Sequence, residues 1–190
     1  RNNYNSILSV AFNGEFLEPN GKKVLYLEFI GDGYMTGFGN LGSGSGSSKT
    51  KIIEETSVTD ALPYLTAKAL NADYSIVAHS QIGFKKAAGA FALPGLYDNQ
   101  YAYRELDTAY DPERTPDAIV FHLGTDDTAT SLPSGVFVET AAAYIETLRN
   151  EYYGGEKVPV IWLYNTMYHA MRVGDIKALV QYMGGDSAGV

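Results

Sequence analysis

Four short apolar segments recur along the chain, each with the composition of a buried β-strand. They cover about residues 24–30, 74–79, 118–123 and 158–163 and are rich in β-branched and aromatic residues. Apolar runs of this length, bounded by glycine or polar residues, are typical of strands that are covered on both faces in a parallel sheet. We therefore expect the four segments to pair in one parallel sheet, in the order 2-1-3-4.

Helical patterns alternate with the predicted strands. One helix is expected from Ser57 to Asn71, with Asp60 or Thr59 as its N-cap. A second is expected to start with Ser134 as its cap and to stop at residues 154–155, and a last one covers about residues 174–183. Apolar residues recur with the helical period in all three, at Leu62, Leu65 and Ala69, at Phe137, Ala141, Tyr144, Ile145, Leu148 and Tyr152, and at Ile176, Leu179, Val180 and Met183. The alternation predicts right-handed crossovers and a three-layer α/β sandwich with a flavodoxin-like sheet.

The remaining stretches are predicted to be connections. Residues 1–20 are interpreted as a leading strand or linker, with a hairpin signal at Asn13-Gly14, and residues 21–190 as the main domain. The Gly- and Ser-rich residues 39–50 predict a flexible coil. This coil lacks the Gly-Lys-Ser/Thr ending of a phosphate cradle, and no strong helix start follows it directly. Residues 84–117 form a long connection that contains Tyr97, Tyr101, Tyr103 and Tyr110.

Composition and charge narrow the classes of function. The 190 residues are 45% hydrophobic and 19% charged, as in an ordinary globular domain. The net charge of −8 argues against a nucleic-acid partner, because phosphate binding needs clustered Lys and Arg. No apolar run has the length of a membrane span, and cysteine is absent, so no disulfide or thiolate metal site is expected. The fifteen tyrosines suit either core packing or stacking on sugars.

The first predicted strand runs into Gly31-Asp32-Gly33-Tyr34-Met35-Thr36-Gly37-Phe38-Gly39. This stretch resembles the nucleophile block of the SGNH, or GDSL, hydrolases, and most closely the carbohydrate esterases of family two, which remove acetyl groups from plant polysaccharides. Further resembling blocks follow in the same order at Ser80-Gln81, Leu93-Tyr97 and Gly124-Asp127. The resemblance implies an SGNH-like domain over residues 21–190, without the family's N-terminal β-sandwich and its last strand and helix, and a secreted or cell-surface location.

The family's catalytic positions are substituted in this chain. Gly33 stands at the nucleophilic serine and has no hydroxyl to attack an acyl carbon. Gln81 stands at the oxyanion-hole glycine, and Asp126 stands at the oxyanion-hole asparagine, where an ionised carboxylate can only accept hydrogen bonds. No Asp-x-x-His block supplies the family's base before Val190, although His169 follows the fourth predicted strand and is a candidate. His79 and His122 fit hydrogen-bonded histidines of the core or sheet end better than a base.

The resulting expectation is a degenerate, non-catalytic domain that binds plant-type polysaccharide or oligosaccharide in the old cleft. An active acetyl esterase and a scaffolding domain of an extracellular assembly, with other domains or chains as partners, stay open as alternatives. Asp32, Asp126 and Asp127 are a minority candidate for a cation site, and the serines at 43–48 or Ser80 for a replacement nucleophile, but no metal and no cofactor is expected. The expected ligand-binding residues are Asp32, Tyr34, Gln81, Tyr97, Tyr101 and Asp126.

Overall fold

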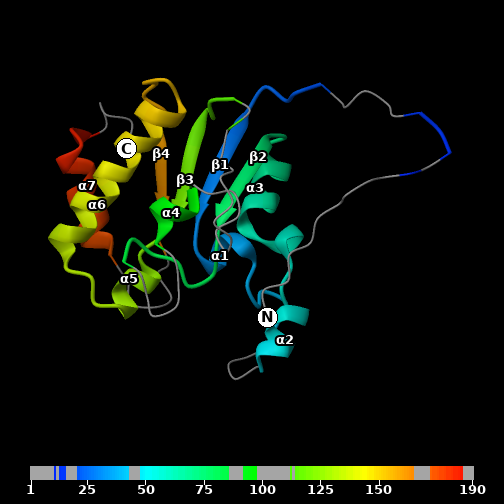
Figure 1. The fold of residues 1–190 in the computed structure, drawn as a ribbon, viewed down its shortest axis with the longest axis horizontal. Helices are drawn as coiled ribbons and strands as arrows, with labels where there is room; N and C mark the ends of the chain where they lie inside the picture. The colour runs from blue at the N-terminus through cyan, green and yellow to red at the C-terminus, as the bar shows by residue number, and fades with distance from the viewer. Residues whose placement is uncertain are drawn as a thin grey trace.

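The computed structural model of the chain describes residues 11, 13–15, 21–42, 48–85, 92–97, 112, 114–164 and 172–185. Its four strands are β1 (Tyr26–Gly31), β2 (Asp73–Ala78), β3 (Ala118–His122) and β4 (Val160–Leu163). All of them pair in parallel in the order β2-β1-β3-β4, as Figure 1 shows. The predicted strand order and pairing are therefore confirmed, with strand ends that differ from the expected ones by one or two residues.

Strand β1 lies in the middle of the sheet and is buried along its whole length. Its alternate side chains point to opposite faces, so Leu27 and Phe29 join one apolar cluster and Ile30 joins another. Neighbouring β3 divides in the same way, since Val120 lies in the first cluster and Phe121 in the second. A strand covered on both faces needs the near-continuous apolar sequence from which it was predicted.

Helices cover both faces of the sheet and complete three layers (Figure 1). Helix α3 (Leu62–Ala69) packs on the face of Leu27 and Phe29. On the other face lie α6 (Ser134–Thr147), which continues into the π-turn η2 (Leu148–Tyr152), and α7 (Val173–Tyr182). The predicted three-layer α/β sandwich is confirmed.

The first predicted helix is shorter than expected. The segment expected to be helical from Ser57 forms a separate short 3₁₀ turn, η1 (Val58–Asp60), and Ala61 is the N-cap of α3 without a side-chain bond. The predicted cap, Asp60, instead accepts a hydrogen bond of 2.6 Å from the hydroxyl of Ser57 and so holds the 3₁₀ turn. The helix cannot extend to Asn71 because that residue adopts a left-handed conformation with φ of 49°.

Four short helices complete the described fold. They are α1 (Gly33–Thr36), α2 (Lys49–Glu54), α4 (Leu93–Tyr97) and α5 (Thr125–Ala129). Helix α2 corrects the coil predicted up to residue 50, because the side chain of Ser48 caps it by accepting from the N–H of Lys51. The predicted cap Ser134 is itself the first helical residue, after Pro133 at the N-cap. The hairpin expected around Asn13-Gly14 lies largely outside the described residues.

Candidate functional site

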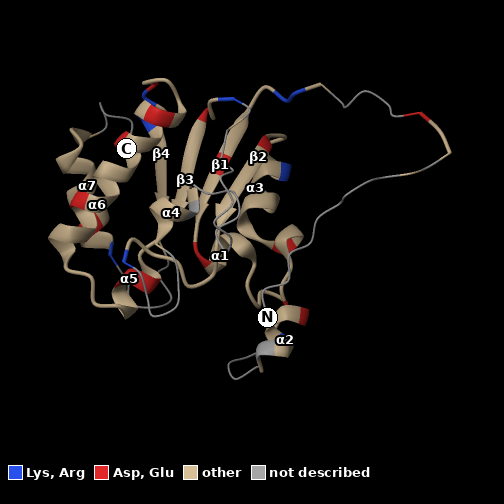
Figure 2. Cartoon of the chain, in the orientation of Figure 1, with Lys and Arg blue, Asp and Glu red and all other residues tan. Residues whose placement is uncertain are grey.

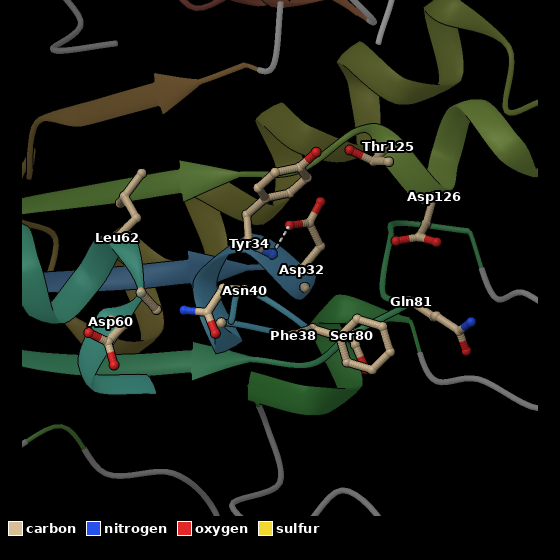
Figure 3. A pocket seen from close by; sticks show the side chains of 13 residues that line it. Asp32, Tyr34, Phe38, Asn40, Asp60, Leu62, Ser80, Gln81, Thr125 and Asp126 are labelled. Atoms are coloured by element: carbon tan, nitrogen blue, oxygen red, sulfur yellow. Dashed lines mark hydrogen bonds between the residues drawn. The ribbon is translucent and has the colours of Figure 1, made fainter. Parts of the chain in front are cut away.

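A pocket of about 500 Å³ opens at the carboxyl ends of β1, β2 and β3. Ligands of parallel α/β sheets bind at this edge, where strand order reverses, because the loops there diverge and leave a crevice. This cavity is called the edge pocket, and Figure 3 shows its side chains. Its lining residues are Asp32, Gly33, Tyr34, Gly37, Phe38, Asn40, Asp60, Ala61, Leu62, Ser80, Gln81, Thr125 and Asp126.

Asp32 is fixed at the floor of the edge pocket. It is the N-cap of α1, and its Oδ1 accepts from the N–H of Tyr34 at 3.1 Å (Figure 3) and lies 3.0 Å from Nδ1 of His122. Since a carboxylate only accepts, Nδ1 of His122 carries the proton of that bond. The other oxygen, Oδ2, is buried and has no partner within the described part of the chain. Asp32 therefore holds one unsatisfied, buried acceptor below the edge pocket.

The two described histidines have structural roles, as expected. His122 is only 6% exposed and is used by Asp32, so it is a hydrogen-bonded residue at the sheet end. His79 directly follows β2, and its Nδ1 lies 2.5 Å from the carbonyl oxygen of Ser80. His169 lies outside the described residues, as do Tyr101, Tyr103 and Tyr110.

The fold does not require a glycine at position 33. A Cβ placed there would lie 3.4 Å from Cβ of Phe38 and 3.8 Å from Cβ of Ser80, which are ordinary van der Waals distances. Its backbone lies outside the left-handed region that favours glycine. A serine side chain would therefore fit at this position.

Gln81 adopts a conformation that suits glycine. Its φ is +64°, in the left-handed region that costs most side chains about 1–2 kcal/mol. The resemblance places the oxyanion-hole glycine at this position, so the backbone here retains a glycine-like turn under a larger side chain. That side chain is exposed and makes no hydrogen bond within the described structure.

We expect Gln81→Gly to stabilise the fold by about 0.5–1 kcal/mol, because relief of the left-handed strain exceeds the added chain entropy of glycine. Urea unfolding of the wild type and the variant measures the difference. Gln81→Ala is the matched control and should give no gain, since alanine keeps the strain. A glycine variant that is less stable than the alanine variant would contradict this interpretation of the turn.

The backbone donors of the two positions are available. The N–H groups of Gly33 and Gln81 donate to no acceptor among the described residues, and both residues line the edge pocket. Such groups can bind an oxygen atom of a ligand. Donors and acceptors therefore occur together in this cavity.

Asp126 contributes a carboxyl group whose charge depends on pH. Burial, reinforced by the negative charges of Asp32 and Asp127, raises the pKa of Asp126 from 3.8 to about 6. At neutral pH the group is ionised and accepts hydrogen bonds, whereas an asparagine would also donate. Asp126 therefore contributes a hydrogen-bond acceptor to the edge pocket at neutral pH.

The raised pKa predicts a specific pH dependence of stability. Between pH 3.8 and about 6 the folded chain holds a proton on Asp126 that the unfolded chain has released, so this group makes stability fall as pH rises. Asp126→Asn should reduce that fall and unfold at a higher temperature than the wild type at pH 7, with little difference at pH 4. Thermal melts of both proteins across this range measure the effect, and equal slopes for the two would contradict it.

Asp127 is turned away from the edge pocket. Its Oδ1 accepts from the N–H of Lys85 at 3.0 Å, while burial raises its pKa. Its carboxylate packs against Gly83, where a Cβ would lie 2.7 Å from Oδ1. Asp32, Asp126 and Asp127 therefore do not converge as ligands, and the described residues contain no group of three or more acidic or histidine side chains placed to hold a metal ion.

The structure corrects one predicted ligand contact. Tyr97 is fully buried, and its hydroxyl donates to Oε2 of Glu28 at 3.0 Å and lies 2.6 Å from that of Tyr153. Tyr153 also donates to the same carboxylate oxygen. Tyr97 therefore links α4 to β1 through a buried hydrogen-bond network. Its ring cannot stack on a ligand. Burying a carboxylate requires such donors, which explains why the aromatic residue points inward.

Sequence reasoning missed an aromatic contributor to the edge pocket. Phe38 is 48% exposed, like Tyr34 at 42%, and both line the cavity. In Figure 3 the Phe38 ring lies beside Ser80, whereas Tyr34 lies on the side of Thr125. Phe38 could have been predicted to line the site, because it belongs to the glycine-rich stretch that follows the first strand.

Comparison with known proteins identifies the relatives of this chain. No family model matches it. An acetylxylan esterase / glucomannan deacetylase of Cellvibrio japonicus is 31% identical over 135 residues, which are 65% of this chain and 37% of the relative. The chain thus spans well under half the length of this relative. Within the described residues no helix is long and apolar enough to cross a membrane.

Solved structures agree on the fold. A carbohydrate esterase whose active site displays divergent catalytic and non-catalytic binding functions superposes with a TM-score of 0.76 at 22% identity, over 91% of this chain and 56% of that one. A family two carbohydrate esterase from Clostridium thermocellum in complex with cellohexaose gives a TM-score of 0.73 at 22% identity, over 92% and 54% of the two chains. The chain therefore has the fold of the SGNH hydrolases, and family two carbohydrate esterases are its relatives in sequence and its neighbours in structure.

Proposed function

We propose that the edge pocket binds a neutral carbohydrate chain of the plant polysaccharide type without hydrolysing its acetyl esters. The observation that carries this proposal is the combination of Gly33, which has no nucleophilic hydroxyl, with a pocket that keeps its polar groups. The loss of the nucleophile removes covalent catalysis but leaves a binding site.

The polar groups of the edge pocket suit sugar hydroxyls. A hydroxyl donates one hydrogen bond and accepts others, so it can donate to the carboxylate of Asp126 while accepting from the N–H of Gly33 or Gln81. Bonds to a charged acceptor are among the stronger ones. The exposed ring of Tyr34 adds an aromatic face beside them.

Charge favours a neutral ligand. Among the described residues, those that line the pocket include Asp32, Asp60 and Asp126 but no Lys or Arg. Figure 2 shows acidic positions in red on α5 and just before α1, at this edge of the sheet. An anionic ligand would be repelled by these carboxylates.

The names of the relatives support the same ligand class. One is named for xylan and glucomannan, and another was solved with cellohexaose bound. A secreted or cell-surface location fits this function, because such polymers are too large to reach a protein inside an intact cell.

Titration calorimetry with cellohexaose and a manno-oligosaccharide tests the proposal at neutral pH. We expect at least one of them to bind, and Tyr34→Ala and Asp126→Ala each to weaken that binding about five- to tenfold through lost stacking or a lost charged acceptor. Ile161→Ala is the control, since Ile161 is 49% exposed on β4 and lies outside the pocket lining. No heat with either sugar, or equal binding by all variants, would reject carbohydrate binding at this site.

A further inference from the structure

A second hollow of about 320 Å³ lies next to the edge pocket, between α1, α2 and the end of β2. It is called the side pocket. The residues that line it are Thr36, Phe38, Ile53, Thr56, Ala78, His79 and Ser80.

The side pocket adjoins the edge pocket. Phe38 and Ser80 line both cavities, and Figure 3 shows these two residues side by side. Gly33 faces both of them, because a Cβ there would lie 3.4 Å from Phe38 and 3.8 Å from Ser80. Gly33 therefore lies next to the two residues that the cavities share.

The lining of the side pocket has one apolar and one polar part. Ile53 is 74% exposed and Phe38 is 48% exposed, so both present apolar surface. The hydroxyl of Ser80 has no partner among the described residues and is available to a ligand. The hydroxyl of Thr56 is used within the protein, where it donates to the carbonyl of Ile52 and accepts from the N–H of Gly39.

Charge again points to a neutral ligand. Among the described residues that line the side pocket there is no Asp, Glu, Lys or Arg, and His79 is the one titratable residue. A sugar ring combines an apolar face with hydroxyl edges, which matches an exposed aromatic ring beside a free hydroxyl.

We propose that the side pocket holds a further sugar unit of the same chain, which continues from the edge pocket across Phe38. This inference rests on the proposed carbohydrate binding in the edge pocket. Phe38 is the stacking platform between the two units, and Ile53 of α2 forms the outer wall. The bound chain therefore exceeds the length that the edge pocket alone accommodates.

The test is the dependence of affinity on chain length. Calorimetry with cellobiose and cellohexaose should give tighter binding of the longer sugar by the wild type. Ile53→Asp changes only the side pocket, so it should weaken cellohexaose binding about tenfold and leave cellobiose binding unchanged. Leu41→Asp is the control, because Leu41 is 57% exposed and lines neither cavity.

The outcomes separate this inference from the proposed function. If cellohexaose binds but its affinity equals that of cellobiose, or Ile53→Asp leaves it unchanged, the side pocket holds no sugar and the edge pocket proposal stands. An equal loss for both sugars in Ile53→Asp would also reject the side pocket, because the change would then act on the edge pocket. If neither sugar binds to the wild type, the side pocket inference falls, and the titration with the manno-oligosaccharide decides on the edge pocket.

Discussion

Gly33→Ser is expected to leave the chain without measurable esterase turnover, although the serine fits. The new Cβ would make only ordinary contacts with Phe38 and Ser80. The hydroxyl would still lack its partners, because Asp126 is an acceptor at neutral pH and neither described histidine is free to act as a base. A lost oxyanion donor costs about 10²- to 10³-fold in rate, and a lost base costs roughly 10⁴-fold or more.

Release of chromophore from an acetate ester at pH 8 measures this outcome, with Asp126 fully ionised. The wild type, Gly33→Ser and the matched variant Gly33→Ala should all stay at the rate of buffer. Turnover by the serine variant that the alanine variant lacks would show that a working base and oxyanion hole remain. The double variant Gly33→Ser/Asp126→Asn then tests the contribution of the carboxylate, because asparagine restores a donor there.

Gly37→Ala is expected to destabilise the fold by roughly 3–5 kcal/mol. Gly37 follows α1 with φ of +70°, where its N–H bonds to the carbonyl of Gly33 as the C-cap. A Cβ would lie 2.2 Å from the carbonyl oxygen of Ser57, a backbone atom that cannot rotate away. Conformational strain and steric overlap therefore act together.

Thermal and urea unfolding measure the loss, which is a large part of the stability of a domain of this size. The matched control is Gly135→Ala, an exposed position in α6 where an added Cβ meets nothing within 4 Å. That change should stabilise the chain by about 0.5 kcal/mol, since alanine is the better helix former. Similar stabilities of the Gly37 variant and the wild type would contradict the close packing of the C-cap of α1 against Ser57.

The sheet was predictable from the sequence because its strands are buried on both faces. Strands β1 and β3 need nearly unbroken apolar runs, and the helical period of α6 and α7 stands out before and after β4. Local hydrogen bonds that compete with helix formation were not predictable. Asp60 is a good N-cap by composition, yet its carboxylate bonds to Ser57 and ends a 3₁₀ turn instead.

The site residues that directly follow a strand could be predicted from the sequence, because their position in the backbone places them at the sheet edge. Asp32, Gly33, Gln81 and Asp126 all follow strand ends, so parallel topology brings them to one edge. Tyr97 was misjudged because a tyrosine in a connection can face a ligand or the core, and the buried Glu28 that binds it is distant in sequence. Phe38 and Ile53 of α2 line the side pocket together, and this depends on how α2 packs, which no local sequence pattern reveals.

We propose above that the edge pocket binds a carbohydrate without hydrolysing its acetyl esters. The most direct test is a proton NMR titration of the chain with an acetylated glucomannan oligosaccharide, in which saturation transfer reports binding and the free acetate singlet reports hydrolysis in the same sample. We predict saturation transfer to the sugar protons, reduced in Tyr34→Ala, with no acetate beyond that formed in buffer. Growth of the acetate signal with protein concentration, or no saturation transfer at any concentration, would contradict the account.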